Sequence, residues 1–118
     1  MLKVHAKRID GVEVLSLEGL IVTGNTEILR NAIQLASGVS ELILDLAKVK
    51  VVDAHGLGVL LQLREQAIAK GIHFELTNVN RSLYRIFEIT RLDTVFTVNR
   101  SIGFVPKFAY ANPMLVAA

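Results

Sequence analysis

The sequence predicts a single α/β domain whose mostly parallel sheet carries an antiparallel hairpin at its N-terminal end. Three observations support this class. Alternating apolar and polar residues at about 2–8 and 12–20 flank Asp10-Gly11, a dipeptide typical of tight hairpin turns. Beyond the hairpin, short apolar segments alternate with longer segments of helical periodicity. Hydrophobic residues make up 52% of the 118-residue chain, which favours strands buried on both faces.

After the hairpin, a helix and a central strand are expected. The stretch 22–38 is predicted to be helical, with Asn25 or Thr26 as its cap and Gly38 at its end. Its apolar stripe, at helical spacing, consists of Ile28, Leu29, Ala32, Ile33 and Ala36. Residues 41–46, ELILDL, have the length and composition of a buried strand.

The second helix is expected at residues 54–70, after a linker at 48–53, and Gly71 ends it. Its predicted inner face consists of Leu57, Leu60, Leu61, the stem of Arg64, Ala67 and Ile68. Its predicted outward face consists of His55, Val59, Gln62, Leu63 and Gln66. Apolar residues on an outward face are typical of a contact surface, and burial against a neighbouring helix would explain Leu63 equally well.

The last elements follow the same alternation. Residues 72–76 are expected to form a strand, and 94–98 an edge strand. Between them Asn80 caps a short helix through Ile89. Its inward residues are Leu83, Ile86 and Phe87, and its outward residues Arg81 and Arg85.

The domain is therefore expected to span residues 1–98, followed by an apolar, non-periodic tail at 99–118. Pro106 and Pro113 interrupt the tail. Two placements of the tail stay open, one against the domain and one against a neighbouring chain in a homodimer.

Composition excludes several classes of function. The chain has no cysteine, which excludes disulfides, thiolate zinc sites and a cysteine nucleophile. Its 13 basic and 11 acidic residues are nearly balanced and do not indicate a nucleic-acid partner. Polar residues interrupt the most apolar stretch, so direct membrane insertion is not expected. The N-terminus lacks the pattern of a signal peptide, and the expected location is the cytoplasm.

Asp53 and His55, where a strand passes into a helix, are the most conspicuous polar pair. No serine or cysteine adjoins them, so the pair lacks the nucleophile that hydrolytic catalysis requires. Asp53 is expected to cap the helix and His55 to be exposed in its first turn. The three histidines lie far apart without ligand spacing, so no metal is predicted. The turn also lacks the glycine and lysine pattern of a phosphate loop, and no cofactor is predicted.

The stretch 42–96 resembles a STAS domain, the family of bacterial anti-sigma factor antagonists. Four motifs carry the resemblance in order: Leu-Asp-Leu in a strand, a hydrophobic-Asp pair, Gly-Leu-Gly entering an apolar helix, and Leu-Asp-x-x-Phe. The resemblance implies helices packed mainly on one face of the sheet. It also implies a protein partner, a kinase-type anti-sigma factor or a related regulator.

The chain departs from the family pattern at three places. Regulated members carry Asp-Ser-Ser-Gly at the turn, with the second serine as phosphoacceptor. Asp53 and Gly56 match this motif, whereas Ala54 and His55 replace the serines, so no phosphoacceptor is expected. Val22 stands where an acidic residue is common. Arg91 stands where glycine is usual, so that either it adopts a left-handed conformation at a cost of about 1 kcal/mol or the helix ends differently.

The resulting hypothesis is a non-enzymatic interaction module of the anti-sigma factor antagonist type that works without serine phosphorylation. Its expected partner-binding residues are Thr23, Asn25, Asp53, Ala54, His55, Gly56, Leu57 and Val59. Asp53 would hold the turn and Gly56 would allow close backbone approach, with His55 and Val59 touching the partner. Three alternatives stay open: a STAS subunit of a membrane transporter, a nucleotide-binding or phosphorylated switch, and self-association through the tail.

Overall fold

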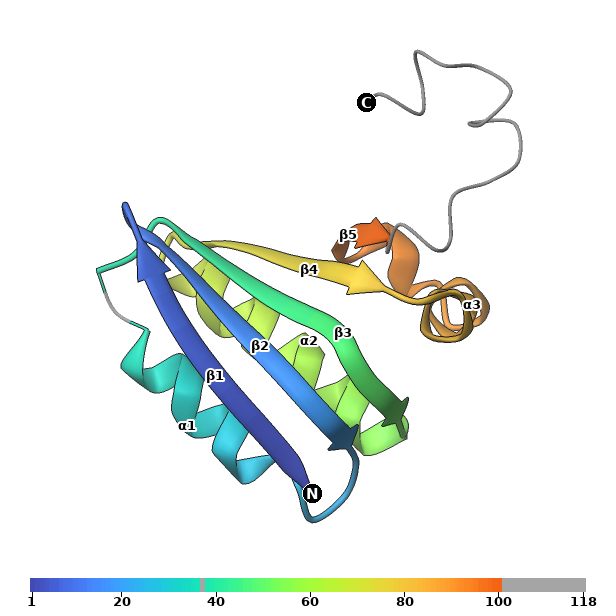
Figure 1. The fold of residues 1–118 in the computed structure, drawn as a ribbon. Coiled ribbons are helices and arrows are strands. Elements are labelled where there is room, and N and C mark those ends of the chain that lie inside the picture. Colours follow the sequence, from blue (N-terminus) through green and yellow to red (C-terminus); the bar gives the residue numbers. More distant parts are fainter. Residues whose placement is uncertain (37, 101–118) are drawn as a thin grey trace, which may run out of the picture.

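The computed structural model describes residues 1–36 and 38–100, which form one mixed sheet and its helices (Figure 1). The elements, in chain order, are β1 (Leu2–Ile9), β2 (Val12–Ile21), α1 (Glu27–Leu35), β3 (Glu41–Val52), α2 (Ala54–Ala69), β4 (His73–Val79), α3 (Arg81–Ile89), the short 3-10 helix η1 (Leu92–Thr94) and β5 (Thr97–Arg100). The expected tail lies outside the described residues, apart from the two positions that belong to β5.

The five strands follow one another across the sheet in the order β1-β2-β3-β4-β5. β1 and β2 are antiparallel, and every later neighbouring pair is parallel. Asp10 and Gly11 join the hairpin with φ angles of 50° and 79°, the positive values that a tight two-residue hairpin turn requires. The predicted α/β class and its N-terminal hairpin are confirmed.

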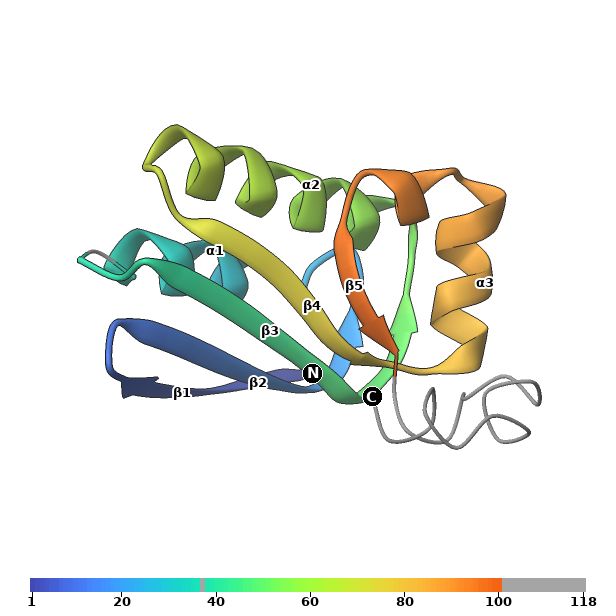
Figure 2. The ribbon, with the colours of Figure 1, turned by 90° about the horizontal axis from the view of Figure 1, so that it is seen from above.

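Two helices cover one face of the sheet, as the resemblance implied. α1 and α2 lie side by side on this face, while α3 lies beyond the end of β4 (Figure 2). The core lies between these layers, and its largest fully buried side chains include Leu15, Leu17, Ile21, Leu29, Ile33, Leu42, Leu44, Leu60 and Leu63. Within the described part of the chain, no helix has the length and apolar character needed to cross a membrane.

The linker expected at residues 48–53 is wrong, because β3 continues to Val52. Its extension stays paired with β2, with Ile21 opposite Val52. Pairing with β4, in contrast, ends where Asp45 lies opposite Thr77. β3 and β4 therefore diverge beyond this point, as Figure 1 shows.

The predicted orientation of α2 is also wrong in part. Val59 and Leu63, expected on the outward face, are each 1% exposed, whereas Ile68, expected inward, is 50% exposed. Leu57, Leu60 and Ala67 are buried as expected. Apolar residues occur on every side of this helix, so periodicity alone could not orient it. Packing against the sheet and against α1 decides which side is buried.

Smaller corrections apply to α1 and β5. Ile28 is 46% exposed because it is rotated by roughly 100° from the buried Leu29 of the next position. The last strand begins at Thr97, after the 3-10 helix η1. Phe96 is buried instead of forming part of an exposed edge, and its ring centroid lies 5.4 Å from that of Phe87.

Arg91, directly after α3 and its C-cap residue, adopts the left-handed conformation with φ 62° and ψ 22°. The first of the two expectations for this position is therefore confirmed. A side chain at such dihedral angles is disfavoured, because its Cβ crowds the backbone.

We expect Arg91→Gly to raise the free energy of unfolding by about 0.5–1 kcal/mol, because glycine adopts positive φ without steric cost. Urea denaturation measures the change. Glu88→Gly is the matched control, since it places glycine at an exposed position inside α3 and should lower stability by about 1 kcal/mol. An equal loss of unfolding free energy in both variants would contradict the left-handed conformation of Arg91.

Candidate functional site

The carboxylate of Asp53 joins two loops at the end of the domain where β2 and β3 finish. Its Oδ1 accepts a hydrogen bond from the backbone N–H of Gly56 at 2.7 Å, which caps α2 as expected. Its Oδ2 accepts from the backbone N–H and the hydroxyl of Thr23, at 3.1 and 3.2 Å. The backbone bonds from Gly56 and Thr23 favour the charged form and lower the pKa of Asp53.

Gly56 brings the first turn of α2 against the end of β2. A Cβ at this position would lie 2.0 Å from the carbonyl oxygen of Ile21, closer than any real side chain approaches. The same carbonyl accepts a hydrogen bond from Asp53 N–H at 3.3 Å. Gly56 thus allows close approach of α2 to β2 within the domain, and its expected role toward a partner stays a prediction.

His55 is exposed next to this junction, and its imidazole turns toward α1. Its Nε2 lies 3.3 Å from the hydroxyl oxygen of Thr26, which is 3% exposed. Thr26 occupies the N-cap position of α1 but makes no side-chain cap hydrogen bond. The predicted cap is therefore right in position and wrong in mechanism, because the hydroxyl contacts the second helix instead.

Beside His55, a shallow hollow of about 180 Å³ lies between α1 and α2. It is lined by Arg30, His55, Gly58, Val59 and Gln62. Nothing lies within 4 Å of a Cβ placed on Gly58, so this part of α2 is open.

The structure brings some of the predicted site residues together at the junction. Others point away from it or are buried. Thr23, Asp53, His55 and Gly56 meet at one junction, and Ala54 is exposed beside them. The side chain of Asn25 instead reaches back to the carbonyl of Leu20, at 3.5 Å. Two residues expected at the contact surface are buried, Leu57 at 9% and Val59 at 1% exposure.

Arg30 and Gly58 are the residues that sequence reasoning missed. Arg30 follows Thr26 by one helical turn on the polar side of α1. The sequence does not predict that this side of α1 faces the start of α2. Arg30 was therefore interpreted as a solvent-exposed residue of the polar face. Gly58 lies one position after the buried Leu57 and marks the open side of the helix.

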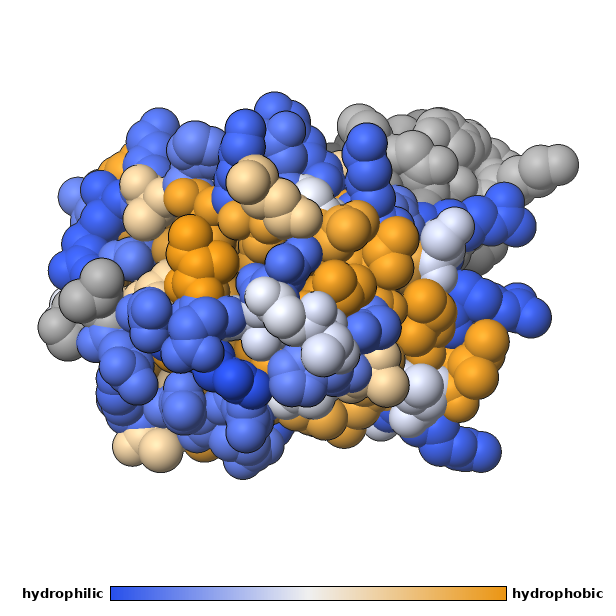
Figure 3. All heavy atoms as spheres, turned by 90° about the horizontal axis from the view of Figure 1, so that it is seen from below, coloured by the Kyte–Doolittle hydropathy of each residue, from blue (hydrophilic) through white to orange (hydrophobic). Residues whose placement is uncertain are grey.

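Figure 3 views the domain from the end at which β2 and β3 finish and α1 and α2 begin. Apolar side chains gather in the middle of this end and extend to one side, with hydrophilic side chains around them (Figure 3). Next to the junction, Ile28 contributes a side chain that is 46% exposed. A surface with apolar and cationic groups suits contact with another protein.

The junction lacks the arrangement that hydrolytic chemistry needs. Among the described residues, the hydroxyl that His55 contacts is that of Thr26, which is buried. Among residues 1–36 and 38–100, no three histidine, aspartate or glutamate side chains converge as metal ligands.

Residues 3–105 match the sequence pattern of the STAS domain. The chain belongs to the STAS family. Its fold resembles that of an anti-sigma factor antagonist from Mycobacterium paratuberculosis, with 25% identity, a TM-score of 0.76, and coverage of 87% of this chain and 89% of that one.

Two further structures share the fold of this STAS domain. The anti-sigma factor antagonist SpoIIAA in its unphosphorylated form is 16% identical, with a TM-score of 0.69 over 95% of this chain and 96% of that one. A sulfate transporter family protein from Wolinella succinogenes is 22% identical, with a TM-score of 0.72 over 95% and 93% of the two chains. Both likenesses concern the fold.

The two glycines at the start of α2 should respond oppositely to alanine. Gly56→Ala forces its methyl group into the Ile21 carbonyl and should lower the free energy of unfolding by about 2–3 kcal/mol. Gly58→Ala meets open space and should raise it by about 0.5–1 kcal/mol. Thermal or urea unfolding of both variants measures the difference. A well-tolerated Gly56→Ala would contradict the close approach.

Asp53 should make stability depend on pH in the acid range. Its carboxylate has a lowered pKa in the folded state, so its stabilisation is fully present above the ordinary aspartate pKa of about 3.9. This stabilisation is lost as the pH falls through the lower pKa of the folded state. We expect the stability gap between wild type and Asp53→Asn to be constant at neutral pH and to shrink below pH about 4.

Unfolding by urea at a series of pH values measures this gap. Glu88→Gln, which removes an exposed carboxylate from α3, is the control and should leave the acid limb of the wild-type curve unchanged. A stability difference between wild type and Asp53→Asn that stays constant at every pH tested would contradict this prediction. It would show that the bonds from Gly56 and Thr23 to the carboxylate do not stabilise its charged form.

Proposed function

We propose that this STAS domain is a non-enzymatic anti-sigma factor antagonist, which binds a kinase-type anti-sigma factor through the first turn of α2. The observation that carries the proposal is the fixed junction itself. Asp53 and Gly56 hold the turn against β2 and the β2–α1 loop, and they leave Ala54 and His55 exposed. A pre-organised turn binds a partner without an ordering cost.

The chemistry of the surface indicates what the partner should present. Arg30 and His55 offer hydrogen-bond donors at the hollow between the helices, which suits an acidic side chain. Ile28 and Ala54 offer exposed apolar contacts at its rim. The open position at Gly58 lets a partner approach the backbone of α2.

Phosphorylation of a serine would not control this contact. The turn from Asp53 to Gly56 contains no hydroxyl, because Ala54 and His55 stand where regulated relatives carry serines. The neighbouring hydroxyls are engaged, that of Thr23 by Asp53 and that of Thr26 by His55. Binding is then constitutive, or is regulated through the partner.

Titration calorimetry of the purified chain with the kinase-type anti-sigma factors of its own organism tests the proposal. We expect at least one of them to form a complex. Gly58→Arg should weaken that complex by about tenfold or more, because the new side chain fills the hollow at the contact. The domain should tolerate this change, since nothing lies within 4 Å of the new Cβ.

Ile68→Arg is the matched control, since it adds the same side chain at a half-exposed position near the other end of α2. It should leave the complex unchanged. Incubation of the complex with ATP should transfer no phosphate to the wild-type chain, as mass spectrometry would show. Absence of any complex, equal effects of both arginines, or phosphate on Thr23 would each contradict the proposal.

The resemblance to the Wolinella succinogenes protein supports a second candidate, an accessory domain of an anion transporter, since that structure matches along 93% of its length. The same turn would then contact the transporter. Co-purification of the chain with a transporter encoded beside its gene distinguishes the candidates, and loss of that contact in Gly58→Arg would favour this second one.

A further inference from the structure

β1 leaves one side of its backbone unpaired at the edge of the sheet. It is the first strand in the sheet order, and β2 is its neighbour on the other side (Figure 1). Within residues 1–36 and 38–100, no strand pairs with the outer side of β1. An edge of this kind can accept an extended segment as a further strand.

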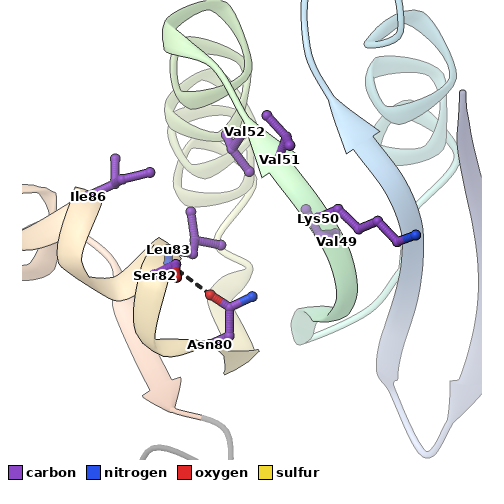
Figure 4. Close-up of a pocket in the computed structure, with 8 residues that line it drawn as sticks. All are labelled: Val49, Lys50, Val51, Val52, Asn80, Ser82, Leu83 and Ile86. Carbon is purple, nitrogen blue, oxygen red and sulfur yellow. Dashed lines mark hydrogen bonds between the residues drawn. The ribbon is translucent and has the colours of Figure 1, made fainter.

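A second unpaired edge, along the end of β3, differs because a helix faces it. Val51 on this edge borders a hollow of about 230 Å³, and Leu83 and Ile86 of α3 project toward this hollow (Figure 4). β1, in contrast, is exposed at every residue from His5 to Ile9. Of these two edges, β1 is the one that is open to a partner.

The backbone groups that β1 presents at its outer side are those of its even-numbered residues. Successive residues of an antiparallel strand turn their N–H and C=O groups alternately toward one side and the other. The carbonyl of Met1 accepts a hydrogen bond from Leu20 N–H at 3.1 Å, so the odd-numbered residues face β2. Val4, Ala6 and Arg8 therefore direct their N–H and C=O groups outward.

The even-numbered side chains of β1 lie on the face of the sheet that α1 and α2 cover. Leu2 is buried there, and Val4 packs against the core. Arg8 is already paired, with its Nη2 2.6 Å from the carboxylate of Glu13. An added strand would place alternate side chains beside Val4 and Ala6 on this face, where apolar residues fit.

The odd-numbered side chains point to the open face, because successive side chains of a strand alternate between faces. Lys3, His5 and Lys7 form an exposed row there. Val14 of β2, the residue opposite Lys7, carries no charge. Among the described residues, neither lysine of this row forms an ion pair with a carboxylate. Carboxylates on an added strand would lie across from these cations and attract them.

A second copy of the chain fits this edge poorly. Two β1 strands could pair antiparallel about a two-fold axis at Val4, His5 or Ala6. Each of these registers places a lysine of one copy opposite a lysine or histidine of the other. Like charges directly opposite each other destabilise a strand pair, so the row of cations favours a partner of opposite charge.

We propose that β1 binds an extended acidic segment of a partner protein, which joins the sheet as a strand. Its carboxylates lie across from Lys3 and Lys7, and the apolar residues between them lie beside Val4 and Ala6. This inference concerns the edge of the sheet instead of the turn at 53–56, and it does not depend on the proposed function.

Hydrogen exchange of the isotope-labelled chain, followed by NMR, tests the proposal with a short synthetic peptide of alternating glutamates and valines. At saturation the peptide should slow exchange of the Val4, Ala6 and Arg8 amides by about tenfold or more, because their N–H groups gain acceptors. Amides of the odd-numbered residues, which already face β2, should change little. A matched peptide with lysines in place of the glutamates should slow neither set.

Calorimetric titration with the acidic peptide tests the charges and the backbone separately. Lys7→Glu should weaken binding by about tenfold or more, because it places like charges together. Arg85→Glu is the matched control, since it makes the same change of net charge at an exposed position of α3 and should leave binding unchanged. Ala6→Pro removes an outward N–H that β2 does not use, so it should weaken binding in a chain that still unfolds cooperatively.

Several results would overturn the proposal. These are unchanged exchange at Val4 and Ala6 with the acidic peptide, equal binding of the two peptides, equal effects of Lys7→Glu and Arg85→Glu, or full binding by Ala6→Pro. Slow exchange of these amides in the free chain that disappears on dilution would overturn it in favour of a second copy. Slow exchange in the free chain at every concentration would overturn it in favour of another segment of the same chain.

Discussion

The geometry of the candidate site depends on the contact between the first turn of α2 and the end of β2. Gly56 permits it by lacking a side chain, and the carboxylate of Asp53 fastens it by accepting bonds from both sides of the junction. A Cβ at Gly56 would conflict with the Ile21 carbonyl, and loss of the charge at Asp53 would weaken its bonds to Gly56 and Thr23. The exposed residues Ala54 and His55 would then lose their fixed position relative to α1.

This constraint also bears on the contact surface that we propose. The polar atoms at the junction are engaged with one another, Asp53 with Gly56 and Thr23, and Thr26 with His55. Such pairing holds the turn against the end of β2 and the start of α1. The features that remain for a partner are shape, an apolar rim and the donors of Arg30 and His55.

The two sides of β3 differ in how far they are paired, because β3 and β4 diverge. Towards β2 the strand is paired to its last residue, which supports the turn before α2. Towards α3 the same residues leave an edge and an apolar groove. β3 thus ends at the junction with α2 and leaves its last residues unpaired on the side of β4. Both features follow because β3 pairs with β2 over more residues than with β4.

Several features of the fold and site were predictable from local sequence. Asp10-Gly11 specified the hairpin because both residues accept positive φ. Asn80 capped α3 because its side chain accepts from Leu83 N–H at 2.8 Å, a bond that depends on residues three positions apart. Asp53 was recognisable as a cap for the same reason. These interactions are short in sequence, so their partners are already fixed by spacing.

What the sequence by itself determined is the order of elements, the class of the fold, and the identity of the turn with its cap and close-packed glycine. Tertiary structure decided which side of α2 is buried, since an all-round apolar helix has no preferred face until the sheet and α1 contact it. It also decided that β3 runs to Val52, that Thr26 turns to His55, and that Arg30 stands beside the turn. Each of these depends on residues some 25 to 35 positions apart in the chain, and only the packed sheet and helices bring such residues together.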